Sequence, residues 1–472
     1  MRYLPACILV FAVLGTISAA DRQDCILLKE RMFEPQVLLD QDPDNHMCHA
    51  SSIVEAKNGT LICVFYAGQE EGEGHEIWMC KKPVGGTWST PEQFTNTGGD
   101  VFNPVLFQPK VNPDAPLLLY FRIGAWDGSG VVLYSDDNGD TWYEPPNGER
   151  YPDYTSQPQG RWGTDLPLLP SGHCMNVNRF GGPDKALPLE LPSGSLLFGS
   201  GMKGGSRWRF NIEQTPTDNY YSGNWILNEV CVEGTQPTFI VLSPDYQDLK
   251  VLMRLTSPYV SDDGGATWTR SSGQPDNGGA AMAAVTLDNG WHACAHTPGR
   301  DLIKISVSEN GSSWTQAVIV EDEPPSHSYP FMFAGSDGNL HLSWTWVDVH
   351  GGGSPGEASI GHAIIEPNLL VGLPATKTGK NSPLSPGEKK LAIKQNKLSE
   401  AITITYAVET DGYVRLGLFD ISGKNIKMVA DGIHQKGLHT IAINRKDLPG
   451  TRVVIAQLQR EGMQPESALL AF

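Results

Sequence analysis

A short phrase, made of a turn followed by an apolar strand, recurs six times along this 472-residue chain. The copies include NGTLICVFYAG and DGNLHLSWTW, and they begin at Asn58, Asp114, Ser193, Gln247, Asn289 and Asp337. A period of about 40–50 residues in a strand-forming sequence is typical of the four-stranded blades of a β-propeller. The 51 glycines and the low charged fraction of 19% also favour β structure over helices. The sequence therefore predicts an all-β fold with six blades.

A second phrase ends in tryptophan and falls between the apolar strands. Full copies are SDDNGDTW, from Ser135 to Trp142, and SDDGGATW, from Ser261 to Trp268, while shorter forms end at Trp88 and Trp314. Ser and Asp side chains accept hydrogen bonds from turn amides, Gly adopts a positive φ, and Trp packs beside the neighbouring hairpin. We expect these turns to join the third and fourth strands of their blades. They would then be scaffolding, and the functional face would lie at the opposite ends of the blades.

The Trp turns match the pattern S-x-D-x-G-x-x-W, which resembles the Asp box of sialidase-like (BNR-repeat) six-bladed propellers. Further segments from about residue 40 to 366, among them CHASSIVEAKNGTL, SRWRFNIEQTP and EDEPPSHSYP, resemble secreted bacterial proteins of the exo-alpha-sialidase-like type. The resemblance implies a sialidase-like propeller and an exo-acting glycosidase that hydrolyses a terminal acidic sugar, sialic or uronic acid-like, from a glycan.

Both ends of the chain differ in composition from this repeat region. Residues 1–20 combine a basic start, an apolar run and small residues, which predicts a signal peptide and a secreted or cell-surface protein. The propeller is expected over 21–368, followed by a Pro/Gly/Lys/Ser linker at 369–389. Alternating apolar residues then predict a small β-sandwich over 390–472. This tail resembles sorting or FlgD-like immunoglobulin-type modules, which implies cell-surface attachment; a carbohydrate-binding module is the alternative.

The formal net charge of −18 argues against nucleic acid as a partner, because such binding needs clustered Lys and Arg. No second apolar stretch is long enough for membrane insertion. Seven cysteines remain after Cys7 of the signal peptide, in an odd number and without a CxxC pair, so we expect one or two disulfides plus buried thiols and no cysteine-zinc site. A glycan or oligosaccharide substrate is the expected partner, and no cofactor or metal is predicted.

Candidate site residues come from the strands predicted to line the central channel. A His can act as a general acid or base, Arg pairs with carboxylates, and amides bind sugar hydroxyls. The resemblance implies a tyrosine nucleophile in the sixth blade, which is carried over to Tyr329. The predicted catalytic residues are His49, Glu213 and Tyr329. The predicted substrate-binding residues are Asn103, Lys185, Arg207, Arg209, Gln236, Arg254 and His327.

The chain also departs from the family pattern. CHAS stands where sialidases carry FRIP, Ala283 replaces an expected Asp, and Asn211 replaces an expected His. Two alternatives to hydrolysis therefore stay open at this point. One is a uronate lyase, with His49 or Tyr329 as the base and Arg207 neutralising the carboxylate. The other is a glycan-binding propeller without catalysis.

Overall fold

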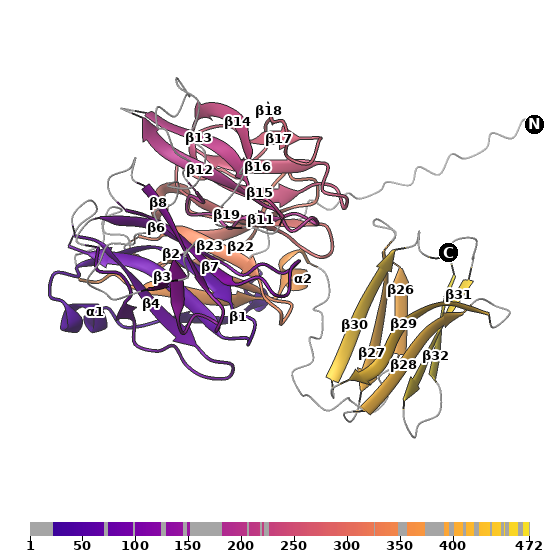
Figure 1. Ribbon diagram of the computed structural model, residues 1–472. Helices are drawn as coiled ribbons and strands as arrows, with labels where there is room; N and C mark the ends of the chain where they lie inside the picture. Colours follow the sequence, from indigo (N-terminus) through magenta and orange to yellow (C-terminus); the bar gives the residue numbers. More distant parts are fainter. Residues whose placement is uncertain are drawn as a thin grey trace, which may run out of the picture. The chain divides into compact units, whose positions relative to one another are not determined.

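The computed structural model describes residues 22–372 and most of residues 391–471 (Figure 1). Within these ranges it leaves out 70–73, 98–99, 124–128, 145–148, 152–181, 205–206, 218–219, 221–225, 325, 348–355, 396–400, 409–411, 420–423, 435–436, 445–447, 449–452 and 461–465. The predicted signal peptide therefore lies outside the described residues. The chain divides into two compact units, Met1–Ala375 and Thr376–Phe472, which are taken separately below.

The first unit is a six-bladed propeller in which each blade is one antiparallel sheet. The first blade contains β2 (Met47–Glu55), β3 (Leu61–Gly68), β4 (Glu76–Lys82) and β5 (Glu92–Gln93). The second contains β6 (Val101–Phe107), β7 (Leu117–Ile123), β8 (Ser129–Ser135), β9 (Trp142–Glu144) and β10 (Glu149–Tyr151). The third contains β11 (Leu189–Glu190), β12 (Leu196–Gly204), β13 (Arg207–Gln214) and β14 (Ile226–Glu233).

The remaining blades follow the same order along the chain. The fourth contains β15 (Thr235–Val241), β16 (Leu249–Arg254), β17 (Tyr259–Ser261) and β18 (Thr269–Arg270). The fifth contains β19 (Met282–Thr286), β20 (His292–His296), β21 (Ile303–Ser308) and β22 (Thr315–Glu321). The sixth contains β23 (Ser328–Ala334), β24 (Leu340–Thr345), β25 (Ile360–Ile365) and β1 (Ile26–Arg31). Short helical segments lie outside the sheets: η1 (Gln23–Cys25), α1 (Gln36–Gln41), η2 (Pro298–Arg300) and α2 (Pro367–Leu370).

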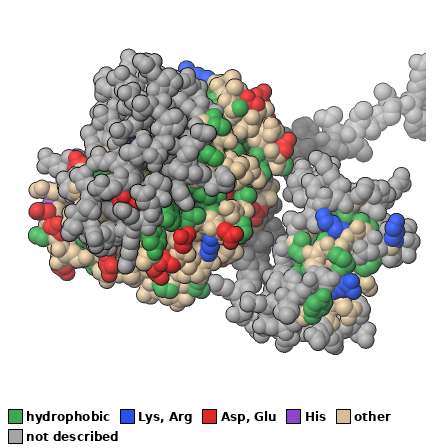
Figure 2. Space-filling view, viewed as in Figure 1, with side chains coloured by type: hydrophobic (Ala, Val, Ile, Leu, Met, Phe, Trp, Pro, Cys, Tyr) green, Lys and Arg blue, Asp and Glu red, His purple; other side chains and the backbone are tan. Residues whose placement is uncertain are grey.

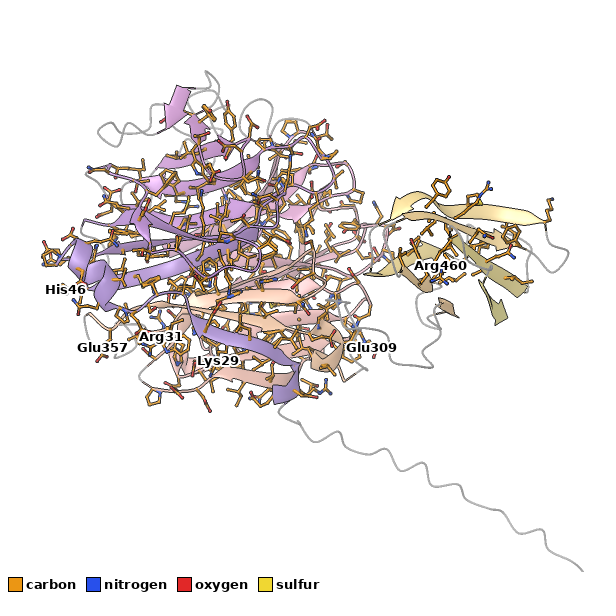
Figure 3. The ribbon with its side chains drawn as sticks, turned by 90° about the horizontal axis from the view of Figure 1, so that it is seen from below. Lys29, Arg31, His46, Glu309, Glu357 and Arg460 are labelled. Atoms are coloured by element: carbon orange, nitrogen blue, oxygen red, sulfur yellow. The ribbon has the colours of Figure 1, made fainter. Side chains whose placement is uncertain are left out.

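The six recurring apolar strands are the second strands of the six blades, which confirms the repeat predicted from the sequence. The ring is closed by the N-terminal strand β1, which pairs with β25 as the outermost strand of the sixth blade. Glu30 on β1 accepts hydrogen bonds from Lys82 Nζ at 2.6 Å and from Trp88 Nε1 at 3.0 Å, both in the first blade. On the opposite face of β1, Lys29 forms an ion pair with Glu321 of the fifth blade at 3.2 Å (Figure 3 labels Lys29). One strand therefore connects three blades.

The Trp turns join third and fourth strands, as predicted, and the two full copies share three hydrogen bonds within the turn. In SDDGGATW, Ser261 Oγ accepts from Gly265 N at 2.8 Å, Asp263 Oδ1 accepts from Thr267 N at 2.8 Å, and Trp268 Nε1 donates to Gly265 O at 2.8 Å. The copy at 135–142 repeats all three bonds. Gly265 has φ +93°, and a Cβ there would lie 2.7 Å from Leu197 Cδ1 of the preceding blade. The turn thus needs glycine both for its backbone and for packing between blades.

Five cysteines have described side chains, namely Cys25, Cys48, Cys63, Cys80 and Cys294, and all of them are buried free thiols. The expected buried thiols are confirmed by these five, which form none of the expected disulfides. The side chains of Cys174 and Cys231 lie outside the description, so one disulfide stays a prediction. Cys63 and Cys80 stand opposite each other on β3 and β4. They belong to an apolar core that also contains Phe65, Trp78 and Phe331, so packing explains their burial.

The second unit has two sheets with a common core. One contains β26 (Leu391–Gln395), β27 (Ala401–Val408) and β30 (Gly437–Asn444), and the other contains β29 (Asn425–His434), β28 (Gly412–Phe419), β31 (Val453–Arg460) and β32 (Glu466–Ala471). Alternate residues of β27 and β28, such as Ile402, Ile404, Val414 and Leu416, are buried together. This is the alternation predicted for a small sandwich.

Surface charge differs between the two units. Acidic side chains are spread over the visible face of the first unit, whereas the charged side chains described on the visible face of the second are basic (Figure 2). Residues 376–472 contain 14 Lys or Arg against 9 Asp or Glu in a chain of net charge −18. In the part of the chain that the structure describes, no helix is long and apolar enough to cross a membrane.

Candidate functional site

The inner strands share an irregular backbone at the end where each strand begins. Because successive strands of a blade run in opposite directions, this end lies opposite the turns between third and fourth strands, which are the Trp turns. The register shifts in four of them, β2, β6, β15 and β23. At these shifts, non-glycine residues have positive φ: Ala50 (51°), Asn103 (48°), Gln236 (50°) and Tyr329 (51°). Lys185, just before β11 in the third blade, has φ +70°. Such conformations cost free energy and persist where the surrounding structure imposes them, often at functional sites.

The side chains of Tyr329, Arg254 and Gln236 meet at this end of the channel. Arg254 Nη1 donates to Tyr329 Oη at 3.0 Å and to Gln236 Oε1 at 2.9 Å, while its Nε donates to Gly279 O at 2.7 Å. Arg254 is half-buried, whereas Tyr329 and Gln236 are buried. A guanidinium is thus held in a fixed orientation against a phenol, with the arginine more accessible than the tyrosine.

His49 packs against the same tyrosine from the first blade. The two ring centroids are 4.2 Å apart with an interplanar angle of 67°. His49 Nδ1 lies 3.1 Å from Thr345 Oγ1, a contact that fixes the ring orientation. Tyr66, which is directly opposite His49 in the sheet, continues the aromatic wall toward Phe102 and His75. These aromatic and imidazole rings therefore pack into a buried cluster at this end of the inner strands, with Tyr329 linking it to Arg254.

Asp184 and Lys185 lie beneath this group and are each only 1% exposed. Asp184 accepts from Asn103 Nδ2 at 2.8 Å, from Thr235 Oγ1 at 2.7 Å and from the amide of Gln236 at 3.2 Å. Lys185 Nζ donates to the carbonyls of Ser51 at 3.0 Å and Pro330 at 3.3 Å. Burial lowers the pKa of Lys185 to about 7, because the apolar surroundings disfavour the ammonium.

A second arginine occupies the position in the second blade that Arg254 occupies in the fourth. Arg122 is the strand partner of Phe102, directly before the register shift in β6. Arg254 is likewise the strand partner of Thr235, directly before the register shift in β15. Arg122 is buried, and its Nη1 donates to Gly201 O. It therefore links the second blade to the third.

The structure joins six of the ten predicted site residues through these contacts: His49, Asn103, Lys185, Gln236, Arg254 and Tyr329. Glu213 lies on β13, two strands out from the channel wall, where its Oε2 accepts from Gly182 N at 3.2 Å. His327 lies apart from the group, with Nε2 2.7 Å from Glu323 O and its ring edge-on to Trp346. The backbones of Arg207 and Arg209 belong to β13, but their side chains are outside the described residues.

Four residues of this region, Asp184, Thr235, Thr345 and Arg122, were not among the site residues predicted from the sequence. One signal in the sequence could have found Arg122 and Thr345. Three of the positive-φ residues precede proline, in the dipeptides Asn103-Pro104, Gln236-Pro237 and Tyr329-Pro330, each at the start of an inner strand. Aligning the blades on these dipeptides brings Arg122, Arg254 and Thr345 to equivalent places on the second strands. Among the described residues, no group of three or more His, Cys, Asp or Glu is placed to hold a metal ion.

Comparisons with known proteins agree with this architecture. Residues 59–342 match the family described as BNR repeat-like domain. A protein of unknown function from Dyadobacter fermentans has a TM-score of 0.51 and 14% identity over 72% of this chain and 98% of its own. The leech intramolecular trans-sialidase has a TM-score of 0.50 and 14% identity over 73% of this chain and 71% of its own. The alpha-L-arabinanase of Penicillium chrysogenum has a TM-score of 0.49 and 14% identity over 74% of this chain and 99% of its own.

At these identities the solved structures establish the fold alone, and no curated protein matches the chain in sequence. The matched family, in contrast, spans more than half of the chain, including the Trp turns and all six apolar second strands up to Leu342. The chain belongs to the BNR repeat-like domain family.

Proposed function

We propose that this protein is an exo-acting glycosidase that hydrolyses a terminal acidic sugar from a glycan. The observation that carries the proposal is the 3.0 Å contact between Arg254 Nη1 and Tyr329 Oη at the starting ends of the inner strands. Arginine is the side chain best suited to a carboxylate. Where the carboxylate of a sugar is bonded to its anomeric carbon, an arginine that binds it also brings the reacting carbon next to the tyrosine.

Tyrosine suits this substrate because a neutral nucleophile approaches an anionic sugar without charge repulsion. In the proposed reaction, Tyr329 Oη gives its proton to His49 and bonds to the anomeric carbon as the glycosidic bond breaks, and His49 passes that proton through water to the departing oxygen. Water then attacks the same carbon, the bond to Tyr329 Oη breaks, and the proton lost by the water returns to the phenol through His49. His49, in contact with Tyr329, is the proposed proton carrier, since an imidazole exchanges protons near neutral pH. Asp184 is not assigned this role because three hydrogen-bond donors already surround it.

The test uses sialyl and uronyl oligosaccharides, with the products identified by mass spectrometry. We expect Tyr329→Phe to lower kcat by about 10²–10³-fold with little change in KM, because the ring packing remains and the nucleophile is lost. Arg254→Met should raise KM by about tenfold or more, because it removes a carboxylate contact. Turnover that survives Tyr329→Phe, or glycan retention without any product, would contradict the proposal; the second result would instead support a glycan-binding propeller.

The contact between His49 and Tyr329 also favours a second candidate, a uronate lyase. Here one of the two rings removes the proton next to the carboxylate, the bond to the leaving oxygen breaks, and the other ring protonates that oxygen. No water is consumed, and the product carries a carbon–carbon double bond. Reaction in ¹⁸O-labelled water separates the candidates, because hydrolysis adds one labelled oxygen and elimination adds none.

The role of the C-terminal unit is proposed as attachment to the cell surface. Its excess of Lys and Arg supports this role, because bacterial surfaces are rich in anionic glycans and lipids. Export through residues 1–20 also remains a prediction from the sequence. Following the full-length protein through culture, envelope and cytoplasmic fractions checks both; recovery only from the cytoplasm would contradict them.

A further inference from the structure

Asp184 and Lys185 of the third blade are adjacent in sequence, yet their side chains contact four other blades. These are the first, second, fourth and sixth blades, whose inner strands each carry a residue of positive φ at this end of the channel. Asp184 binds the side chain of Asn103 in the second blade and the amide of Gln236 in the fourth. Lys185 binds the carbonyls of Ser51 and Pro330, which directly follow Ala50 and Tyr329 in the first and sixth blades. Each contact is made at, or next to, a residue of positive φ.

From these contacts we propose that Asp184 and Lys185 are positioning residues, which hold Tyr329, Gln236 and Asn103 in the geometry that the active site requires. The proposal rests on the proposed function in one respect, that Tyr329 and Arg254 act on the substrate. Neither Asp184 nor Lys185 is placed to touch the sugar, because both are buried and their charged atoms are bound to groups of the neighbouring inner strands. This changes the role predicted from the sequence for Lys185, from substrate binding to support.

The path from this pair to the reacting groups is short. The amide of Gln236 is held by Asp184, and the side chain of Gln236 in turn orients Arg254 at 2.9 Å. The carbonyl next to Tyr329 is held by Lys185, whose Nζ also lies 5.9 Å from the centroid of the Tyr329 ring. The nucleophile and the arginine are thus fixed by two neighbouring side chains. A displacement of about 1 Å in such a site is enough to reduce rates strongly.

Burial of Lys185 supports a specific role, because an ammonium in an apolar site is costly and is kept only with good partners. The lowered pKa of about 7 reflects that cost. A methionine of similar length would pack in the same space without the free-energy cost of burying a charge. A methionine would leave the carbonyls of Ser51 and Pro330 without the two hydrogen bonds that Lys185 Nζ donates at 3.0 and 3.3 Å.

The chain provides a matched control in Lys250 of the fourth blade. It is also buried, and its Nζ donates to the carbonyls of Ser272 at 2.7 Å and Gly273 at 2.8 Å. It differs in location, because it lies beside the Trp-turn end of the blade, where Leu249 pairs with Ser261. Lys250→Met therefore removes the same kind of contact as Lys185→Met, at the end of the blades away from the channel residues.

The experiment compares the variants Lys185→Met, Asp184→Asn and Lys250→Met in the full-length protein. Amide hydrogen exchange is followed in peptides covering 235–241 and 328–334, together with the thermal midpoint and steady-state kinetics. We expect Lys185→Met to speed exchange in 328–334 and Asp184→Asn to speed exchange in 235–241, with kcat lowered about tenfold or more and KM changed far less. Lys250→Met should lower the midpoint to a similar extent but leave kcat within about twofold.

The proposal is overturned if Lys185→Met and Lys250→Met reduce kcat equally at equal loss of stability. It is also overturned if Lys185→Met and Asp184→Asn leave the hydrogen exchange of both peptides unchanged. Should the wild-type protein turn over no glycan, the proposed function fails but the exchange measurement still decides whether the pair holds these strands. If either channel variant does not fold, Asp184→Glu and Lys185→Arg, which keep the charge, replace it under the same criteria.

Discussion

Two carboxylates at opposite ends of the blades satisfy their hydrogen bonds in different ways. At the Trp-turn end, Asp263 bonds to Ser261 and Thr267, within four residues of itself. At the channel end, Asp184 bonds to residues 51, 52 and 81 positions away. The first carboxylate completes a turn that can form by itself, whereas the second has partners only when several blades are in place. We therefore expect local carboxylates to contribute little to stability and inter-blade contacts to contribute much.

The largest effect is expected where a carboxylate spans the closure of the ring. Glu30→Ala removes the acceptor for Lys82, Trp88 and His362 and should lower the free energy of unfolding by roughly 2–3 kcal/mol, after allowance for the partial exposure of Glu30. Urea unfolding measures this change. Glu309→Ala, on the surface in the turn after β21, serves as the control and should change stability by less than about 0.5 kcal/mol. Equal losses of stability for Glu30→Ala and Glu309→Ala would contradict the expectation that contacts between blades contribute more than exposed carboxylates.

The same carboxylate predicts a pH dependence. The hydrogen bond from His362 and the contacts of Lys82 lower the pKa of Glu30 from 4.5 to about 2. Because the folded-state pKa is below the unfolded one, this contribution is fully present above about pH 4.5 and is lost as the pH falls toward 2. The stability difference between wild type and Glu30→Ala should shrink over that window. A difference that is constant with pH would contradict the assignment.

An intermediate effect is expected for the glycine that seats a Trp turn on the preceding blade. Gly265→Ala should cost roughly 1–3 kcal/mol, because φ is +93° and the added Cβ would lie 2.7 Å from Leu197 Cδ1. Gly290→Ala is the matched control, since φ is +85° there but no atom lies within 4 Å of the new Cβ. Thermal unfolding of both variants separates backbone strain from the contact between blades. If Gly290→Ala destabilises the protein as much as Gly265→Ala, the close approach to Leu197 contributes nothing to the loss of stability.

The smallest effect is expected for the turn carboxylate itself. Asp263→Asn should destabilise by less than about 1 kcal/mol, because the side chain is exposed and its bonds are local. Asp262→Asn, at the variable position of the same turn, should leave the urea midpoint unchanged. A loss above about 2 kcal/mol for Asp263→Asn would remove the distinction between local and inter-blade carboxylates.

The architecture was predictable because its signals are local. Each apolar second strand and each Trp turn is encoded within about ten residues, and the bonds from Ser261 and Asp263 need no distant partner. Which of the cysteines stay free was not predictable in the same way. Export permits disulfides, but whether two cysteines pair depends on their separation in the folded sheet and not on their spacing in the chain.

The candidate site was predictable only in part. His49, Asn103, Lys185, Gln236, Arg254 and Tyr329 were selected from their place at inner strands, and the fold joins them. The roles of these residues could not be predicted from the sequence, because a role depends on which groups each side chain contacts in the folded protein. Asp184 was overlooked because nothing near it in sequence reveals that Asn103 and Gln236 will donate to it.

The sequence by itself determined a six-fold repeat, the turns that hold each blade and the end of the blades where function belongs, because periodicity and turn chemistry act over short distances. Only the tertiary structure decided that β1 closes the ring, that Arg254 lies against Tyr329, and that a buried Asp184 and Lys185 support them. Those contacts join residues from different blades, and their geometry exists only after the blades have packed around a common channel.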